Sequence, residues 1–248
     1  MSESRRPKYL EIKDDLAHRI QRGDFTAGRA LPAQARLSQE YGVTLMTLRQ
    51  ALRGLQDDGL IVQQPGRGTF VAPTPALDLR SLGSLADDMR AQGVSLSTEV
   101  LAQGRRALPA TAATGLGRPR GERALRLERL RRLGRRPAVH QVSWVPEPWA
   151  GDLLDVDFSQ ASLYGSLRER CGVSISTAAE TLHARALAEP IARAAARPAG
   201  RPVMVAERIT YDDGGVPVVW DSATILGDEV RVTARRSLSD VQLAWTAS

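Results

Sequence analysis

The chain has little of several features that mark whole classes of protein. It has a single cysteine, Cys171, and can therefore form no intrachain disulfide. The first residues are polar and lead into no apolar run of signal-peptide length. No stretch approaches the roughly 20 apolar residues that a membrane-spanning helix needs. These absences predict a soluble cytoplasmic protein without structural disulfides.

Residue types that usually carry catalysis or bind metals are few and scattered. The three histidines, His18, His140 and His183, lie far apart in the sequence, and no metal-ligand spacing or Cys/His dyad appears. The segment Gly66-Arg67-Gly68 lacks the third glycine and the following helix of a dinucleotide site, and the P-loop lysine is missing as well. The sequence therefore predicts no metal, no cofactor and no enzymatic activity.

Positive charge is in excess but does not by itself locate a binding site. The net charge is +6 and the sequence pI is about 10.2, which is compatible with nucleic acid as a partner. The first 72 residues carry 11 Lys and Arg against 8 Asp and Glu, and the remainder carries 23 against 20. Because both parts have the same excess, the placement of the charges must indicate the site.

A proline-containing segment divides the chain. Pro73 and Pro75 fall within four residues, which suits an extended and fairly stiff connector. The pattern before it is helical and ends in one hairpin, whereas strand-like runs predominate after it. We therefore expect an N-terminal domain over residues 1–72, a linker over 73–81 and a C-terminal domain over 82–248.

The N-terminal domain is predicted to contain three helices and a hairpin. Apolar residues at helical spacing indicate helices over about 9–22, 33–41 and 44–58, with Thr44 as the N-cap of the third. Residues 60–64 and 69–71 have strand character around a turn at 65–68. A glycine turn before an amphipathic third helix is typical of a helix-turn-helix, and a hairpin directly after it is typical of a wing.

The third helix has one apolar and one outward face, and the outward face is the candidate DNA interface. Residues 48, 51, 52 and 55 are apolar and are expected to be buried. Arg67 lies between two glycines at the wing tip, where an arginine suits a narrow and electronegative minor groove. A generic three-helix bundle with a solvated polar face is the alternative. The candidate DNA-binding residues are Thr44, Leu45, Met46, Thr47, Arg49, Gln50, Arg53, Gly66, Arg67 and Gly68.

The C-terminal domain is predicted to be α+β with an antiparallel sheet. Strand-like runs cover 97–102, 125–133, 138–145, 180–187, 202–211 and 216–225, and helices are expected over 162–171 and 189–197. The segment 102–121 is rich in Ala, Gly, Arg and Pro and is expected to be partly loop.

Two arginines on an apolar strand face form a candidate anion site. Alternation along 125–133 places Arg129 and Arg131 on the same face as three leucines. A buried arginine needs a partner, and a bound carboxylate or phosphate would supply one through bidentate hydrogen bonds. There are two alternatives. The arginines could pair internally with a glutamate, namely Glu128, Glu180 or Glu207, or they could be exposed at a sheet edge.

The N-terminal domain resembles the GntR family of bacterial regulators. The resemblance covers nearly all of residues 8–72 and rests on Leu31-Pro32, Tyr41–Thr44, Met46–Leu52, Gly59–Ile61 and Gly66–Val71. Ala35 and Leu45 stand where family members often have arginine. The resemblance implies a winged helix-turn-helix that binds a palindromic double-stranded DNA operator.

The C-terminal domain resembles the UTRA effector domain of HutC-type GntR regulators. The resemblance rests on Ser97–Leu101, Leu127–Arg131, Ser162–Tyr164 and Tyr211–Pro217. It implies a chorismate-lyase-like fold, a homodimer and an effector pocket, in which Arg129, Arg131 and Ser162 match ligand-binding positions of sugar-phosphate-sensing members. Gln141 stands where a glutamate is usual. The candidate effector residues are Arg129, Arg131, Gln141, Ser162, Tyr164 and Tyr211.

These patterns together predict a sequence-specific, DNA-binding transcriptional regulator. Repression is the default of the family, and an anionic small molecule is the expected effector that releases the protein from DNA. Two alternatives remain at this point: a lyase-like enzyme on the C-terminal fold, and a DNA-binding dimer whose second domain binds no effector.

Overall fold

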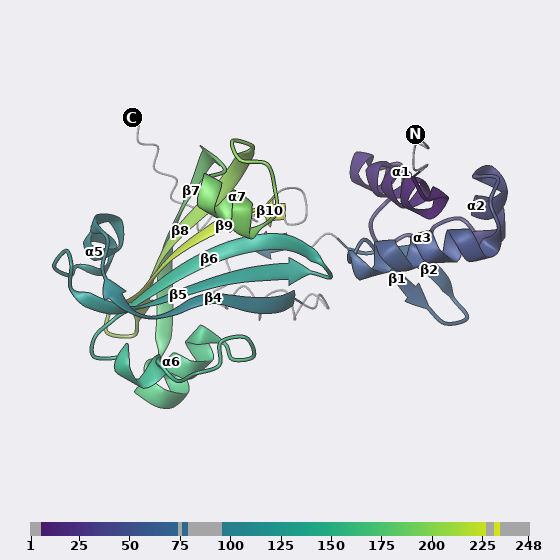
Figure 1. The fold of residues 1–248 in the computed structure, drawn as a ribbon. Helices are drawn as coiled ribbons and strands as arrows, with labels where there is room; N and C mark the ends of the chain where they lie inside the picture. The colour runs from purple at the N-terminus through teal and green to yellow at the C-terminus, as the bar shows by residue number, and fades with distance from the viewer. Residues whose placement is uncertain (1–5, 74–75, 79–95, 227–230, 234–248) are drawn as a thin grey trace, which may run out of the picture.

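The computed structural model describes residues 6–73, 76–78, 96–226 and 231–233. Figure 1 shows two folded parts, a small helical one at the N-terminus and a larger one built on a sheet. Among the described residues, no helix has both the length and the apolar character needed to cross a membrane.

The N-terminal part consists of three helices and a two-stranded hairpin, as predicted. The helices are α1 (Lys8–Arg22), α2 (Gln34–Glu40) and α3 (Leu45–Asp57), and β1 (Ile61–Gln64) pairs antiparallel with β2 (Gly68–Val71). The predicted N-cap of α3 is confirmed, because the Thr44 hydroxyl accepts a hydrogen bond from the Thr47 amide at 3.3 Å. The predicted inner face is confirmed as well, since it is buried at Leu48, Ala51, Leu52 and Leu55.

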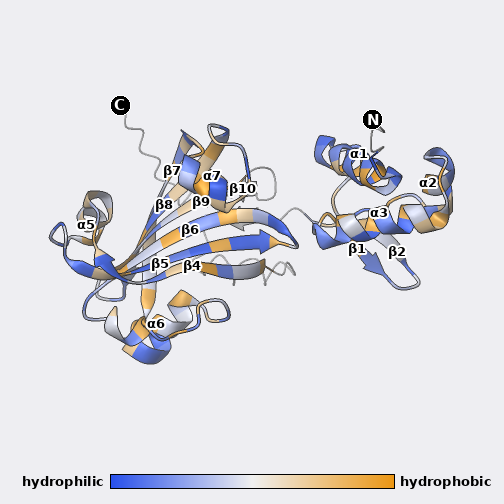
Figure 2. Ribbon diagram, in the orientation of Figure 1, coloured by the Kyte–Doolittle hydropathy of each residue, from blue (hydrophilic) through white to orange (hydrophobic). Residues whose placement is uncertain are grey.

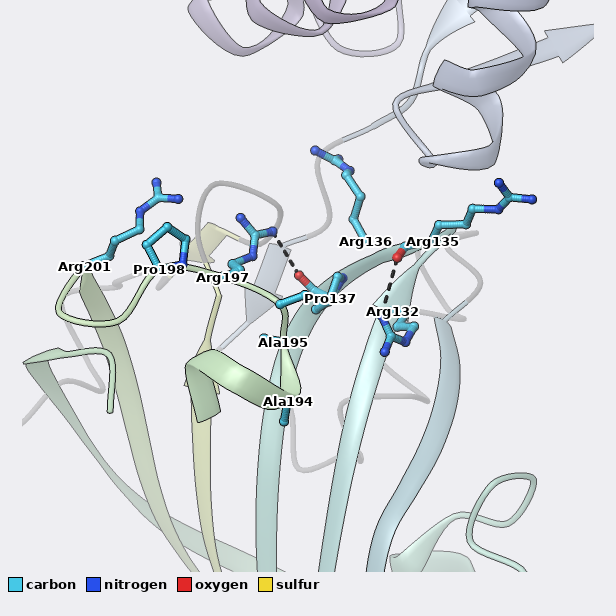
Figure 3. A pocket seen from close by; sticks show the side chains of 10 residues that line it. Arg132, Arg135, Arg136, Pro137, Ala194, Ala195, Arg197, Pro198 and Arg201 are labelled. Carbon is cyan, nitrogen blue, oxygen red and sulfur yellow. Dashed lines mark hydrogen bonds between the residues drawn. The ribbon is translucent and has the colours of Figure 1, made fainter. Parts of the chain in front are cut away.

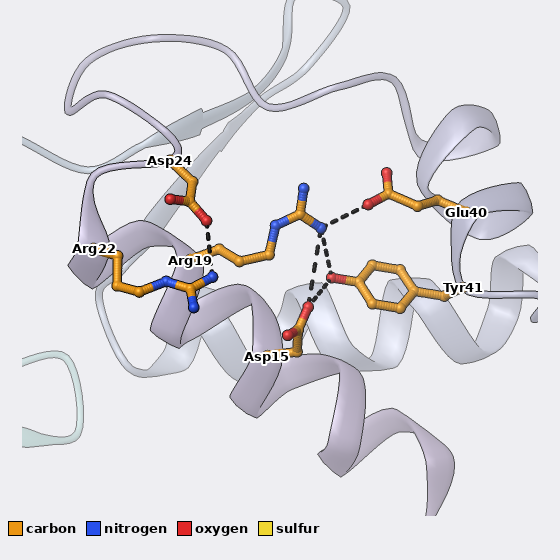
Figure 4. A network of polar contacts seen from close by, with 6 residues as sticks. All are labelled: Asp15, Arg19, Arg22, Asp24, Glu40 and Tyr41. Carbon is orange, nitrogen blue, oxygen red and sulfur yellow. Dashed lines mark hydrogen bonds and ion pairs between the residues drawn. The ribbon is translucent and has the colours of Figure 1, made fainter.

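A polar network fixes α1 against the end of α2 (Figure 4). The Arg19 guanidinium donates to the Glu40 carboxylate at 2.7 Å and to the Tyr41 hydroxyl at 3.0 Å. The Tyr41 hydroxyl in turn donates to Asp15. Burial, together with the hydrogen bond to Asp15, raises the pKa of Tyr41 to about 12 and keeps the phenol neutral. The network holds the segment that leads into α3.

The C-terminal part is built on a six-stranded sheet in the order β4-β5-β6-β9-β8-β7, with every neighbouring pair antiparallel. This arrangement confirms the predicted α+β class. The strands are β4 (Leu96–Ala107), β5 (Arg123–Leu133), β6 (Arg136–Pro146), β7 (Ile175–Ala186), β8 (Pro202–Asp212) and β9 (Pro217–Ile225).

Residues 102–121 are more regular than expected. Strand β4 continues to Ala107 because residues 102–107 pair with 123–128 of β5, and α5 (Ala110–Leu116) follows directly. Only short connections remain as loop. Strand β7 also begins five residues before its predicted start, because its early residues pair with β8.

Helices cover both faces of the sheet (Figure 1). Helix α6 (Leu163–Cys171) and the 3-10 turn Gly151–Leu153 pack on the face that carries Leu125 and Leu127. Helices α5 and α7 (Glu189–Ala194) pack on the opposite face, α5 against Trp144 and Trp220 and α7 against Leu130. Because both faces are covered, apolar side chains of β5 are buried on each of them, and Figure 2 shows hydrophobic residues interspersed with hydrophilic ones along the strands.

Part of the expected linker forms a strand. Strand β3 (Ala76–Asp78) pairs in parallel with β10 (Arg231–Thr233), so the segment after the first domain joins the end of the second. The rest of the expected linker and the segment up to residue 95 lie outside the described residues.

The contact between α5 and the sheet provides a stability test. A Cβ at Gly115 would lie 2.7 Å from Cδ1 of Trp220 and 3.1 Å from Cδ1 of Ile209. We expect Gly115→Ala to lower the free energy of unfolding by about 1 kcal/mol or more, because an overpacking cost of about 1–3 kcal/mol exceeds the gain in helix propensity. Thr114→Ala at the exposed neighbouring position is the control. Urea unfolding checks the result, and unchanged stability of Gly115→Ala would contradict this packing.

Candidate nucleic-acid interface and buried polar site

The outward face of α3 is open to solvent along its first two turns. Met46 is 73% exposed and Leu45 is 43% exposed, and the side chains of Arg49, Gln50 and Arg53 are exposed as well. Met46 has the largest exposed fraction among the large apolar side chains that the structure describes. Packing within the domain therefore does not account for Met46, and a partner surface would.

Arg49 is oriented by a contact that the sequence did not reveal. Its Nε donates to Oε1 of Gln34 at 3.2 Å, across the turn between α2 and α3. Gln34 is the first residue of α2 and was not among the candidate DNA-binding residues. The contact restrains the guanidinium near the N-terminal end of α3, where Thr44 and Thr47 also lie.

The wing tip presents Arg67 on a turn that requires glycine. The flanking Gly66 and Gly68 have φ angles of 72° and 119°, and the Arg67 amide donates to the Gln64 carbonyl at 3.0 Å. A Cβ at either glycine would meet no other atom within 4 Å, so the backbone conformation rather than crowding demands glycine. The Arg67 side chain is exposed and faces no steric obstacle from its neighbours.

The predicted burial of the two arginines of β5 is confirmed. Arg129 is 2% exposed and Arg131 is 3% exposed. The Arg129 guanidinium donates to the Ser143 hydroxyl at 3.0 Å, and Ser143 donates to the Asp221 carboxylate. Gln141 accepts from Arg131 at 3.2 Å and donates to Asp221 at 3.0 Å. The network thus spans the three central strands β5, β6 and β9.

The carboxylate that acts on Arg129 is Asp221, and none of the glutamates named as alternatives takes that role. Glu128 accepts from His140 at 2.7 Å on the other face of β5. Glu180 pairs with Arg208 at 3.1 Å, and Glu207 lies 3.8 Å from His183. The alternative in which one of these glutamates pairs with Arg129 is therefore wrong, and the internal partner is an aspartate. No sequence pattern indicates Asp221, because its position opposite Ser143 depends on a strand pairing between distant segments.

Burial affects both the pKa and the hydrogen bonding of the Arg129 guanidinium. Desolvation lowers the pKa of its guanidinium, and the Asp221 charge opposes that change. Its Nε is buried and has no hydrogen-bond partner among the described residues. A donor left in this state carries a desolvation cost that an added acceptor removes.

Helix α6 brings a phenol to the same network. The Tyr164 hydroxyl lies 2.8 Å from the Thr210 hydroxyl and donates to Asp221 at 3.4 Å. Burial raises the pKa of Tyr164 above its usual range, so the phenol stays neutral. Ser162 is the N-cap of α6, and its hydroxyl accepts from the Gly165 amide at 3.4 Å. The cap sets the start of the helix that presents Tyr164.

Not all of the expected effector residues meet. Arg129, Arg131, Gln141 and Tyr164 gather around Asp221, and Ser162 lies at the adjoining helix terminus. Alternation along β8 places Tyr211 with Ile209, whose side chain faces α5, on the opposite side of the sheet from Thr210. Thr98, which accepts from Arg131 at 3.2 Å, and Ser143 belong to the network although the sequence did not single them out.

The described residues contain no group of three or more His, Cys, Asp and Glu side chains suited to a metal ion. The buried site combines two guanidiniums, one carboxylate, a phenol and several hydroxyl and amide groups, a set that suits recognition of a small polar molecule.

Two family models match the chain. Residues 8–71 match the model of bacterial regulatory proteins of the gntR family, and residues 91–231 match the model of the UTRA domain. The second match alone covers more than half of the sequence. The predicted winged helix-turn-helix and antiparallel-sheet effector fold are thereby confirmed.

Named relatives match the chain over most of their length. The HTH-type transcriptional repressor NagR of Bacillus subtilis is 29% identical over 234 residues, which cover 90% of this chain and 91% of the relative. The HTH-type transcriptional repressor PhnF of Mycolicibacterium smegmatis is 30% identical over 211 residues, 84% of each chain. The crystal structure of PhnF from Mycobacterium smegmatis has a TM-score of 0.63 at 26% identity, covering 92% of this chain and all of that one.

The partnership of Arg129 with Asp221 is testable through stability. We expect Asp221→Asn to lower the free energy of unfolding by about 3 kcal/mol, because it leaves a buried guanidinium without its counter-charge. Adding Arg129→Met to this variant removes the unpaired charge and should recover part of the loss. Asp213→Asn, in the exposed turn between β8 and β9, is the control. Equal urea midpoints for Asp221→Asn and the wild type would refute the partnership.

Proposed function

We propose that this chain, which belongs to the GntR family of bacterial regulatory proteins and carries a UTRA domain, is a repressor that a small anionic molecule releases from its operator. Membership of the family makes the chain a DNA-binding transcriptional regulator, as its relatives are. The observation that carries the ligand proposal is the buried Arg129 Nε, which has no acceptor among the described residues.

An anionic ligand fits this site better than a neutral one. Hydrogen bonds from a guanidinium to a charged acceptor are roughly twice as strong as those between neutral groups. Desolvation lowers the pKa of Arg129, and a second negative charge beside it would favour the protonated form as Asp221 does. Arg131, Gln141, Tyr164 and Ser162 supply further polar contacts. We propose this set as the effector site and leave out Tyr211, which alternation places on the other face.

The proposed partner of the N-terminal domain is a palindromic operator, bound in the cytoplasm by a homodimer. Winged helices of this kind read two half-sites with two copies of the recognition helix, so symmetry in the protein matches symmetry in the DNA. We assign DNA binding to residues 1–72 and effector binding with dimerisation to residues 82–248, joined by 73–81. The repressor names of the relatives favour regulation over the lyase-like alternative.

Side chains of α3 and the wing are proposed to have separate roles. Met46 is apolar and exposed at the N-terminal end of α3, where contact with a thymine methyl group is the favourable option. Arg49 reaches a base edge or a phosphate from the same turn. Arg67 enters the minor groove from the wing, where narrow A·T-rich segments concentrate negative potential.

Alanine substitutions test the DNA interface. We expect Arg49→Ala to weaken operator binding by about 1–3 kcal/mol if the guanidinium contacts a base, and Arg67→Ala to weaken binding to A·T-rich flanks. Arg22→Ala is the control, because Arg22 lies at the end of α1 and pairs with Asp24 at 2.9 Å. Fluorescence anisotropy on DNA from the chain's own upstream region, at fixed salt, gives the affinities. Wild-type affinity in both variants would rule out this docking.

Arg131→Ala tests the effector site by separating two activities. We expect the variant to bind operator DNA as the wild type does and to lose release by the cognate metabolite, identified from a panel of anionic compounds. By linkage, DNA and the metabolite must weaken each other's binding to the wild type by the same factor. Arg126→Ala is the control, since Arg126 lies on the other face of β5 and pairs with Glu128. Normal release of Arg131→Ala would place the effector elsewhere.

A further inference from the structure

A second basic site lies where β5 turns into β6, beside the end of α7 (Figure 3). The pocket has a volume of about 340 Å³. Five arginines and no acidic side chain line it. We call it the arginine pocket, and its lining residues are Arg132, Arg135, Arg136, Pro137, Ala194, Ala195, Ala196, Arg197, Pro198 and Arg201.

The arginine pocket is separate from the site around Arg129 and Arg131. Helix α7, whose end forms one wall, packs against Leu130 on the face of the sheet opposite α6. Arg132 follows Arg131 directly on β5, so alternation places it on the opposite face, where it pairs with the exposed Glu99 at 2.9 Å. A ligand in the pocket therefore meets a different set of side chains.

Two arginines of the pocket also hold the recognition helix. The Arg135 amide donates to the carbonyl of Asp57, the last residue of α3, at 2.8 Å. Arg136 Nε donates to the Asp58 carbonyl at 2.9 Å. The turn residue Gly134 lies so close that a Cβ there would overlap the Asp57 carbonyl oxygen. The C-terminal end of a helix favours positive charge, so the Arg136 guanidinium stabilises the docking of α3 on the hairpin in addition to the backbone hydrogen bond from Arg135.

The five guanidiniums differ in how they are engaged. Arg132 pairs with Glu99, Arg135 lies 3.7 Å from the Asp57 carboxylate, and Arg197 donates to the Pro137 carbonyl at 3.2 Å. The Arg201 side chain is exposed, and its guanidinium has no hydrogen bond or ion pair within the described parts of the chain. Like charges gathered at one opening repel each other, and an anion between them removes that cost.

We propose that the arginine pocket binds a phosphate-bearing small molecule and is a second ligand-binding site in addition to the effector site. A guanidinium presents paired donors that match phosphate oxygens, and Arg201 and Arg197 face the same opening (Figure 3). The volume lies at the lower end of the range usual for small-molecule sites. Because no acidic side chain lines the pocket, a phosphate group can contact several arginines at once without competing with a carboxylate.

Occupancy of the pocket is linked to the position of α3. The Arg136 guanidinium lines the pocket and also donates to the Asp58 carbonyl at the end of α3, so a phosphate that draws this guanidinium inward weakens its hold on the helix. A ligand shifts a conformational equilibrium only by its difference in affinity for the two states, and shared side chains provide such a difference. The affinity of the protein for DNA therefore depends on phosphate at this pocket.

Calorimetric titration of the full-length, DNA-free protein with inorganic phosphate and with pyrophosphate tests the site, with chloride holding the ionic strength constant. We expect saturable binding to the wild type and a loss of about tenfold or more in Arg201→Ala, the size of one charge-assisted contact. Arg193→Ala is the matched control, because Arg193 is an exposed arginine of α7 that pairs with Glu189 and does not line the pocket. Arg131→Ala, first checked for intact operator binding, distinguishes the pocket from the effector site, because Arg131 does not line the pocket.

Three results would overturn the proposal. They are the absence of saturable binding to the wild type, equal binding in Arg201→Ala, and loss of binding in Arg131→Ala, which would assign the phosphate to the effector site. A further outcome is possible: Arg201→Glu binds the operator more weakly, and the DNA-free wild type binds no phosphate. That combination would show that the arginines contact the DNA backbone instead. If phosphate at the pocket affects DNA binding, adding phosphate should change the operator affinity of the wild type and not that of Arg201→Ala. An equal change in both proteins would refute this dependence.

Discussion

The burial of Arg129 is the constraint to which the C-terminal domain is fitted. A guanidinium that is 2% exposed is tolerated only where polar groups surround it, and here they come from other strands and from α6. Ser143 on β6 and Asp221 on β9 connect it to the centre of the sheet, and Tyr164 covers the carboxylate from α6. The register of three strands and the placement of one helix are thus tied to a single charge, whose Nε still lacks an acceptor in the described part of the protein.

The hairpin of β5 and β6 contains residues of both proposed ligand sites and the contact with α3. Strand β5 holds Arg129 and Arg131 on its buried face, continues into Arg132 at the arginine pocket, and turns at Gly134 directly onto the end of α3. Residues of the proposed effector site and of the arginine pocket therefore lie on the same hydrogen-bonded hairpin that contacts the end of α3.

The sequence predicted what local periodicity determines and missed what long-range pairing determines. The three N-terminal helices and the Thr44 cap followed from spacing of 3–4 residues, and the burial of Arg129 followed from alternation along one strand. Asp221 was missed because its place opposite Ser143 depends on the pairing of β6 with β9. The contact of Gln34 with Arg49 depends on the angle between α2 and α3, which no periodicity encodes.

The two ends of α3 have different surroundings: one end is held by the hairpin, and the other end is exposed and moves farthest when the helix tilts. Its N-terminal turns present Met46 and Arg49 to solvent, whereas its last turn is held by Arg135 and Arg136. From Met46 to Asp57 the helix rises about 16 Å, so a tilt of about 10° around the held end moves Met46 by about 3 Å. Hydrogen bonds to base edges tolerate only a few tenths of an ångström. A small change in how the hairpin holds the last turn of α3 is therefore enough to move the other end away from the bases that we propose it contacts.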